Sequence, residues 1–389
     1  MRIPLLFSII VFALGFAADF YIYRRLKGHR ALRRAHVALA AAFTLLWALI
    51  VCVPKRTGDD AFMLRLMWAL YAYWSVYVPK YAAVLVDLLG AVPRLWRKAR
   101  VKFFGYAGAT VGLAIFSAMW WGALAGRFHL DVREVSVDIP DLPSDMRGLR
   151  IVQISDWHVG SYGTDTAFVA RTVDSINALR PDIIVFTGDV VNRHSDELRP
   201  FEHTLSRLHA PMGVYSVMGN HDYGDYFSWP SEEAHRADAD TLRSIERRMG
   251  WRMLDNETVI LHRGADSLAL IGVENIGEPP FKTRGDLLRA YPTPADSTAK
   301  ILLSHNPMHW TDSIAGQPGR NIALTLSGHT HAMQMQVGHW SPAEWRYPTW
   351  EGLYSDSLGR KLYVNIGIGT VGMPMRIGAT PEITLLTLN

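Results

Sequence analysis

The sequence LRIVQISDWH at residues 149–158 decides the fold, because it joins a short apolar strand to a polar turn. Residues 149–154 predict the strand, and Asp156 and His158 follow it. Similar apolar runs recur along the rest of the chain, and several of them also end in a polar cluster. They predict further strands at 182–187, 213–218, 259–262, 268–273, 300–303, 322–326, 362–365 and 383–388.

Segments with helical spacing alternate with these strands. They predict helices at 165–179, 197–208 and 231–249. Fully apolar strands that alternate with helices are typical of a layered α/β sandwich whose sheets are covered by helices. We therefore predict an α/β domain at residues 149–389, and a linker at 126–148 that leads into it.

Five short polar clusters follow the predicted strands. Their members are Asp156 and His158; Asp189; Asn220, His221 and Asp222; His305; and His329 and His331. The carboxyl ends of strands in an α/β sheet converge on one crevice, so these side chains can meet across up to 175 sequence positions. Carboxylates, imidazoles and an amide oxygen suit hard-to-borderline divalent cations. Because a carboxylate such as Asp189 can bridge two ions, the clusters predict a two-metal site.

Each cluster taken alone also has a purely structural interpretation. Asp156 is a common residue at a strand end, Gly-Asn-His-Asp at 219–222 suits a hairpin turn, and His305 suits a buried core position. His329 and His331 are more specific, since alternate residues of an extended segment face the same side. The five clusters in this order, each after an apolar strand, favour a functional site.

The N-terminal part has the length and composition of membrane-spanning helices. Four apolar stretches lie at 3–23, 35–53, 61–78 and 103–125. A bilayer core of about 30 Å needs roughly 20 apolar residues in a helix. A cleavable signal peptide is the alternative for the first stretch, but Arg2 is its only basic residue before the apolar run and three more stretches follow. We predict a four-helix transmembrane anchor at residues 1–125.

Ionisable side chains lie in or beside these stretches, at Asp19, Arg65, Lys80 and Asp87. Such groups can mark a transport path. All four are close to the ends of the predicted helices, where long side chains reach the bilayer surface. We therefore interpret the four helices as an anchor.

Charge is divided unevenly along the chain. Residues 1–130 carry a formal charge of +13, whereas residues 131–389 carry −9. The acidic C-terminal part would repel a phosphate backbone, which excludes nucleic acid as its partner. Six Lys/Arg side chains at 24–34 and five at 94–102 predict that these two loops are cytoplasmic. Both chain ends and the α/β domain are then expected outside the cytoplasm.

The ordered polar clusters resemble the calcineurin-like metallophosphoesterase superfamily, over roughly residues 148–389. The segments 350–354 and 363–388 are similar to its membrane-associated bacterial branch. The resemblance implies a four-layer αββα sandwich and hydrolysis of phosphate esters with two divalent ions such as Mn, Fe or Zn. It implies one ion held by Asp156, His158, Asp189 and His331, and a second held by Asp189, Asn220, His305 and His329.

The resemblance also implies that His221 contacts the phosphate or protonates the leaving group, and that Asp222 orients its imidazole. Arg376 is expected either to bind a substrate phosphate or to form a structural salt bridge. The chain departs from the family at Asn192, often Asp, and at Ala332-Met333-Gln334, where the related branch continues Gly-Gly-Gln. The aromatic loop that contains Trp340, Trp345, Tyr347, Trp350 and Tyr354 is expected to dock on lipid, to cover the site, or simply to pack.

The leading hypothesis is a membrane-anchored dimetal phosphoesterase that acts on a lipid-linked or envelope phosphate ester outside the cytoplasm. The first alternative is a cytoplasmic-facing pyrophosphatase of a nucleotide-linked lipid. The second is a non-catalytic membrane sensor or scaffold, which all seven filled ligand positions disfavour. The single cysteine, Cys52, excludes a disulfide scaffold and a thiolate zinc cluster.

Overall fold

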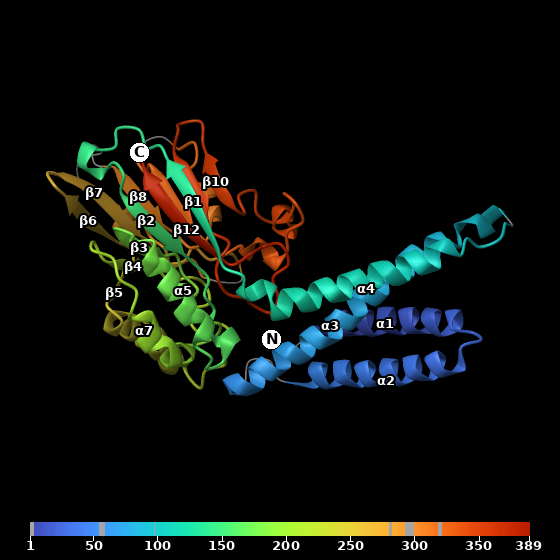
Figure 1. The fold of residues 1–389 in the computed structure, drawn as a ribbon. Helices are drawn as coiled ribbons and strands as arrows, with labels where there is room; N and C mark the ends of the chain where they lie inside the picture. Colours follow the sequence, from blue (N-terminus) through green and yellow to red (C-terminus); the bar gives the residue numbers. More distant parts are fainter. Residues whose placement is uncertain (1–3, 54–58, 97, 280–281, 292–298, 318–320) are drawn as a thin grey trace. The chain divides into compact units, whose positions relative to one another are not determined.

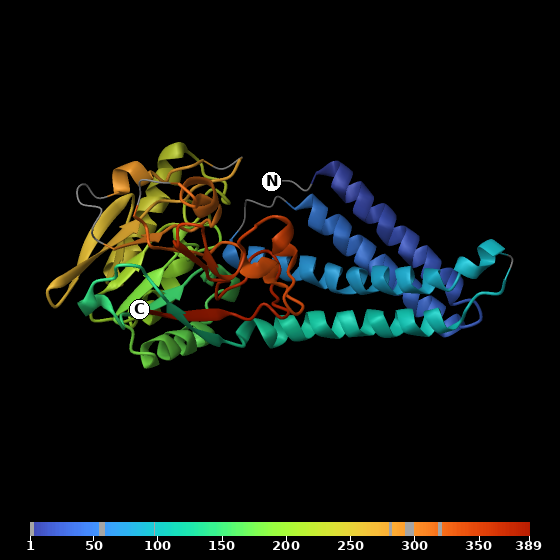
Figure 2. The same ribbon diagram turned by 90° about the horizontal axis from the view of Figure 1, so that it is seen from above.

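A computed structural model describes residues 4–53, 59–96, 98–279, 282–291, 299–317 and 321–389 of the chain (Figures 1 and 2). Residue 3, the first of the predicted first span, lies outside the described residues, as do the basic residues at 2, 55, 56 and 97. The structure contains a helical unit, to which residues up to Ala125 and Gly372–Met375 belong, and an α/β unit, which comprises Gly126–Val371 and Arg376–Asn389.

Four long apolar helices form the N-terminal unit. They are α1 (Leu5–Arg25), α2 (Arg30–Cys52), α3 (Asp60–Leu89) and α4 (Phe103–Leu124). Each is long and apolar enough to cross a bilayer, which confirms the prediction of four candidate spans. Helix α3 continues through Pro79, so the apolar segment that follows this proline extends the third helix and is no fifth span.

Helices α3 and α4 approach closely through small residues. Gly108 and Gly112 are four positions apart on α4, and both face Ala83 of α3. A Cβ atom at Gly108 would meet the backbone carbonyl of Ala83. Small residues at this spacing let two helix backbones touch, which is how apolar helices gain packing energy inside a bilayer.

Two carboxylates inside the helical unit are buried and paired. Asp19 accepts hydrogen bonds from Lys80 Nζ at 2.8 Å and Tyr77 Oη at 2.7 Å. Asp87 accepts one from Arg25 Nε at 2.9 Å, and each carboxylate residue is only 8% exposed. Cationic partners on neighbouring helices therefore pair both aspartates within the helical unit.

Two six-stranded mixed sheets form the α/β unit. In spatial order, the first contains β1 (Asp131–Val137), β12 (Glu382–Leu388), β2 (Arg150–Ile154), β3 (Ile183–Phe186), β4 (Val214–Ser216) and β5 (Trp251–Met253). The second contains β10 (Gly352–Ser355), β11 (Lys361–Val364), β9 (Leu324–Ser327), β8 (Lys300–Leu303), β7 (Asp266–Gly272) and β6 (Glu257–Arg263). Strands β2 to β5 are parallel to one another, as are β7, β8, β9 and β11.

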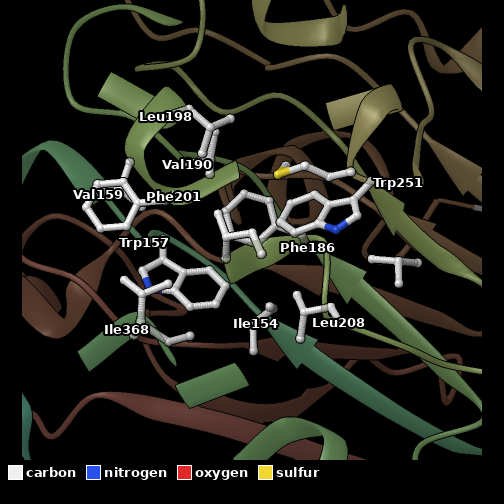
Figure 3. Close-up of a cluster of buried hydrophobic side chains, with 14 of the residues drawn as sticks. Ile154, Trp157, Val159, Phe186, Val190, Leu198, Phe201, Leu208, Trp251 and Ile368 are labelled. Carbon is white, nitrogen blue, oxygen red and sulfur yellow. The ribbon is translucent and has the colours of Figure 1, made fainter. Parts of the chain in front are cut away.

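Three hydrophobic clusters hold the layers together. One lies between the first sheet and helices α5 (Ala167–Ala178) and α7 (Glu232–Arg248), where Trp157, Phe186 and Trp251 meet (Figure 3). The second fills the space between the two sheets. The third joins the second sheet to the short helices α8 (Leu287–Ala290) and α9 (Met308–Ser313). This order of layers confirms the predicted four-layer αββα sandwich.

Some elements differ from the sequence prediction. The segment expected to be a linker contains β1, which pairs in parallel with β12. Charged residues interrupt the apolar pattern of β1, and its partner lies about 250 residues away, so local sequence does not reveal it. Strands β5 and β10 were also not predicted. The helix predicted at 197–208 is a 3₁₀ helix at Ser195–Phe201 followed by α6 (Glu202–Leu205), because Pro200 prevents a regular α-helix there.

Glu246 of α7 makes the stability of the α/β unit depend on pH. It is 1% exposed and accepts a hydrogen bond from the Ser216 hydroxyl. Burial raises the pKa of Glu246 from an ordinary value of 4.5 to about 8. Because the folded chain binds this proton more tightly, the stability that it contributes is complete below about 4.5 and is lost as pH rises toward 8.

We therefore expect the stability of Glu246→Gln relative to the wild type to increase as pH rises from 5 to 8. The measurement is the melting temperature of the detergent-solubilised full chain across this range. Glu233→Gln, at an exposed position in the first turn of the same helix, is the matched control and should show no such trend. A constant difference between Glu246→Gln and the wild type would contradict the prediction.

Candidate metal centre

The carboxyl ends of five strands deliver the predicted ligands to one site. Strands β2, β3 and β4 of the first sheet and β8 and β9 of the second are followed directly by the polar clusters. The ligand atoms form two groups within which all donor atoms lie within 4.8 Å: Asp156, His158 and His331; and Asp189, His305 and His329. The structure thus brings together six of the seven residues that sequence reasoning proposed as ligands, and the seventh, Asn220, lies beside His305.

The first group is almost completely buried. His158 Nε2 lies 3.1 Å from His331 Nε2, and His331 Nε2 lies 3.1 Å from Asp156 Oδ1. Asp156 and His158 are each 0% exposed. Three side chains with hard or borderline donor atoms therefore converge from two different sheets.

The second group shares a carboxylate with the first. Asp189 Oδ2 lies 3.6 Å from His158 Nε2 and 3.2 Å from His305 Nε2. His305 Nε2 is also 3.2 Å from Asn220 Oδ1 and 3.1 Å from His329 Nδ1. The same oxygen of Asp189 thus faces both groups. The other oxygen accepts the backbone N–H of His221 at 2.8 Å, which leaves Oδ2 directed at both groups.

The donor atoms have the spacing that two cations require. Ligands bound at about 2.0–2.2 Å to one ion are separated from one another by roughly 3.0–3.5 Å. The separations from 3.1 to 3.6 Å agree with this. In addition, the buried Asp156 Oδ1 has no hydrogen-bond partner in the described part of the chain, although His331 Nε2 is close. The residues present therefore fit two divalent ions.

Hydrogen bonds outside the ligand set fix which ring nitrogen of each histidine faces the centre. The Nδ1–H groups of His158 and His305 donate to the carbonyls of Val191 at 3.1 Å and Thr187 at 2.7 Å. This leaves both Nε2 atoms as donors of a lone pair to an ion. In His329 the two ring nitrogens have exchanged roles. Its Nε2 bonds to the Tyr347 hydroxyl at 3.1 Å, and its Nδ1 faces the centre.

The buried carboxylates of Asp156 and Asp189 strongly favour positive charge at the site. Burial opposes ionisation of Asp189, but nearby histidines hold its pKa well below the ordinary value. Burial likewise disfavours the His305 imidazolium, but Asp189 outweighs it and raises the pKa of His305 to about 9. Burial and the charge of His305 lower the pKa of His329 to about 3. A proton on His305 and a bound cation therefore compete for the negative charge of Asp189.

The backbone around the ligands is unusually strained. Positive φ angles, between 47° and 75°, occur at Asp156, His158, Asp189, His329 and His331. Non-glycine residues rarely adopt this conformation, and such outliers cluster at functional sites.

The strain continues beyond the last ligand. Ala332, Met333 and Gln334 also have positive φ angles. Glycine adopts this conformation without a Cβ clash, which explains why the related branch can continue Gly-Gly there. Close approach requires glycine at Gly219, where a Cβ atom would overlap the carboxylate of Asp189.

Asp222 has a different role from the one expected. Its carboxylate accepts backbone N–H groups of Asp189 at 2.7 Å, Val190 at 2.8 Å and Gly219 at 2.8 Å. It therefore joins the loop after β3 to the loop after β4 and does not orient the imidazole of His221, which corrects the prediction. Geometry explains this result, because a carboxylate beside several unpaired backbone donors satisfies them first.

Asn192, where the family often has Asp, does not contact the ligands through its side chain. Its amide nitrogen donates to Ser161 Oγ at 3.0 Å, so this departure from the family leaves the ligands unchanged. Its backbone carbonyl accepts the Nδ1–H of His221 at 2.6 Å. Sequence reasoning missed this contact and also the stacking of Tyr226 on His221, since no local pattern marks either one.

Arg376 lies behind the ligands and cannot reach a substrate. It is 1% exposed, and its guanidinium donates to the carbonyls of Gly369, Ala379 and Ile366 at 2.8–3.1 Å. One terminal nitrogen also lies 3.2 Å from His331 Nδ1. Neither expected role of Arg376, a substrate contact or a structural salt bridge, is found among the described residues, because the buried carbonyls of the loop before β12 take up its donors.

The aromatic loop divides into buried and exposed parts. Tyr347 Oη bonds to His329 Nε2, and Trp350 is buried at 7% exposure. Tyr354 Oη accepts the backbone N–H of Trp350 at 3.1 Å, which is a packing role. Trp340 and Trp345 instead contact each other with ring centroids 5.4 Å apart and are 38% and 79% exposed.

The position of Arg376 leads to a prediction about Arg376→Met. We expect the free energy of unfolding to fall by about 2–4 kcal/mol, because buried carbonyls lose their donors at roughly 1–3 kcal/mol each. The KM for a phosphate ester should stay within twofold of the wild type, because no substrate contact is lost. Thermal unfolding and steady-state kinetics of the full chain measure both effects. A KM raised tenfold with unchanged stability would instead indicate that Arg376 contacts the substrate.

Comparisons with known proteins agree with this geometry. Residues 149–333 match the family described as calcineurin-like phosphoesterase. Residues 1–127 match the family described as probable calcineurin-like phosphoesterase, transmembrane domain.

Individual relatives cover one or both parts of the chain. The uncharacterized metallophosphoesterase YkuE of Bacillus subtilis is 30% identical over 271 residues, which cover 67% of this chain and 85% of that protein. The transmembrane protein with metallophosphoesterase domain of Bos taurus is 28% identical over 417 residues, covering 98% and 88%. The UDP-2,3-diacylglucosamine pyrophosphatase LpxG of Chlamydia trachomatis is 29% identical, covering 66% and 88%. The paired His/Asp groups and these similarities together show that the chain belongs to the calcineurin-like metallophosphoesterases and carries their N-terminal four-helix membrane domain.

Proposed function

We propose that this chain is a membrane-anchored dimetal phosphoesterase that hydrolyses phosphate mono- or diesters of a membrane or envelope substrate. The observation that carries the proposal is the position of Asp189 Oδ2, which faces His158 of one ligand group and His305 of the other. Two ions such as Mn, Fe or Zn, bound by the seven ligands, would activate a water and neutralise the phosphoryl oxygens.

His221 is the residue that we propose for proton transfer. Its Nδ1–H is fixed by the carbonyl of Asn192, so Nε2 is the ring atom left to hold or transfer a proton at the leaving oxygen. Its ring stands edge-on to His158, with centroids 4.8 Å apart, which keeps it next to the first ligand group.

The proposal of a membrane substrate rests on the helical unit and the exposed aromatic loop. Residues 1–125 act as the anchor, and tethering raises the effective concentration of a substrate in the same bilayer. In the sequence, Trp340 and Trp345 fall between the ligand His331 and Tyr347, whose hydroxyl bonds to the ligand His329. Tryptophan favours the bilayer interface, so this loop suits contact with the apolar part of a lipid phosphate.

A second candidate is a pyrophosphatase of a nucleotide-linked lipid that faces the cytoplasm. It is favoured by the similarity to LpxG, whose name describes a UDP-linked lipid as substrate. The basic loops on either side of α2 and α3 favour the opposite orientation, with the α/β unit outside the cytoplasm.

Ion removal and replacement test the chemistry. We expect the chelated full chain in detergent to regain hydrolysis of a chromogenic phosphate ester when manganese is added. Asp189→Asn should abolish this activity, because it weakens both ligand groups. His221→Ala should keep two ions per chain and lose about 10²–10⁴-fold in kcat. Metal analysis and kinetics distinguish the two variants. Two bound ions without turnover on monoesters, diesters or lipid phosphates would contradict the proposal.

A double variant, Trp340→Ser with Trp345→Ser, tests the membrane substrate. Its KM for a lipid phosphate in mixed micelles should rise about tenfold or more, since each buried indole stabilises the complex by roughly 1.5–3 kcal/mol. Hydrolysis of a water-soluble ester should be unchanged. Leu358→Ser is the matched control, because Leu358 is 56% exposed in the turn between β10 and β11. Equal effects on both substrates would argue against a lipid-contacting loop.

A reporter fused to the C-terminus tests the orientation in a bacterial host. We expect a reporter that is active only outside the cytoplasm to give a signal, since the basic loops are retained inside. A reporter active only in the cytoplasm serves as the reciprocal control. A signal from that second reporter alone would favour the cytoplasmic candidate.

A further inference from the structure

Tyr226 touches two of the proposed functional residues and belongs to none of the sequence motifs. It lies in the loop after β4, six residues beyond Asn220. Its hydroxyl accepts a hydrogen bond from Asn220 Nδ2 at 2.9 Å. Its ring stacks on the imidazole of His221, with centroids 3.9 Å apart and planes 6° from parallel.

The hydroxyl of Tyr226 accepts a hydrogen bond from the Asn220 amide nitrogen and so stabilises the orientation in which the amide oxygen faces the second ligand group. The amide has an acceptor oxygen and a donor nitrogen in nearly the same shape, so either end can point inward unless a hydrogen bond selects one. Because the nitrogen donates to Tyr226, the oxygen lies toward His305, at 3.2 Å from its Nε2. The flipped amide would present N–H groups to a cation and would repel it.

The ring of Tyr226 determines the plane of the His221 imidazole. The Asn192 carbonyl fixes one ring nitrogen at 2.6 Å, but a single hydrogen bond leaves the ring free to rotate about it. Stacking on Tyr226 removes this rotation from one face, and the edge of His158, 4.8 Å away at 87°, limits it from another side. At a centroid separation of 3.9 Å the two parallel rings are in van der Waals contact, so the imidazole cannot turn toward Tyr226.

A second tyrosine has a related contact on the other side of the same ligand group. Tyr347 Oη lies 3.1 Å from His329 Nε2 and leaves Nδ1 of that ring toward His305. Two of the ligands proposed for the second ion, Asn220 and His329, are therefore each oriented by a tyrosine hydroxyl. Only Tyr226 also contacts the residue proposed for proton transfer.

From these contacts we propose that Tyr226 is a positioning residue with two separable roles. Its hydroxyl stabilises the amide orientation of Asn220 that binds the second ion, and its ring holds the plane of the His221 imidazole. The inference rests on the proposed dimetal function. It assigns Tyr226 no contact with the substrate.

Two substitutions separate the two roles in the full chain in detergent. Tyr226→Phe keeps the ring and removes the hydroxyl, whereas Tyr226→Leu removes both. The chelated protein is titrated with manganese by calorimetry, and the electron paramagnetic resonance spectrum shows whether bound Mn²⁺ ions are paired or isolated. Tyr223→Phe is the matched control, because the Tyr223 hydroxyl bonds to the Asn275 N–H at 3.1 Å, and no hydrogen bond joins it to the ligands among the described residues.

We expect Tyr226→Phe to bind the second ion about 10–100-fold more weakly. When one manganese ion is added per metal site, its spectrum should be that of isolated Mn²⁺. At saturating manganese its kcat should return to within about threefold of the wild type. Tyr226→Leu should show the same loss of affinity and, in addition, a kcat at least tenfold lower at saturating manganese. Tyr223→Phe should match the wild type in all three measurements.

The two levels of the proposal fail in different ways. If wild-type protein binds no coupled pair of ions, the dimetal function itself is contradicted and this inference falls with it. If the wild type binds a coupled pair and Tyr226→Phe binds it equally tightly, only the role of the hydroxyl is overturned. If Tyr226→Leu retains full kcat at saturating manganese, the role of the ring is overturned.

Discussion

The buried carboxylate of Asp189 is the constraint on which the α/β unit depends. It is 2% exposed, and one oxygen faces histidines from both ligand groups. An isolated buried carboxylate is costly, so it persists only where positive charge or hydrogen-bond donors surround it. Here the backbone N–H of His221 satisfies one oxygen, and the second is directed toward the place where the two groups meet.

The packing of the two sheets places histidines from both sheets around this carboxylate. Strand β3 delivers Asp189 from the first sheet, and β8 delivers His305 from the second. The cluster of buried apolar side chains between the sheets fixes their separation, and with it the distances among the ligands. The carboxylate of Asp222 then holds the loops after β3 and β4 together through backbone N–H groups. Packing energy from the layers thus supports the strained backbone at the ligands.

Much of this arrangement could be predicted because it depends on local patterns. Short apolar strands that end in Asp, Asn or His identify both the sheets and the ligands, and parallel strands of α/β folds share one functional edge. The four apolar helices follow from length and composition alone. In each case the property that determines the structure is contained within about 20 neighbouring residues.

The parts that could not be predicted depend on contacts between distant segments. Strand β1 forms because β12 supplies its hydrogen bonds, although its own sequence is charged. Asp222 and Arg376 have side chains typical of catalytic sites, but backbone donors and carbonyls from other loops satisfy them. Tyr226 was not identified because stacking on His221 depends on how the loop after β4 folds back. Residue type indicates what a group can bind, whereas the fold decides which partner is present.

The most direct test of the central claim is a crystal structure of the full chain grown with manganese, with anomalous diffraction measured at the manganese absorption edge. We predict two anomalous peaks about 3.5–4 Å apart. Asp189 Oδ2 should lie within bonding distance of both, with Asp156, His158 and His331 around one and Asn220, His305 and His329 around the other. A single peak, or two peaks that do not share Asp189, would contradict the dimetal centre.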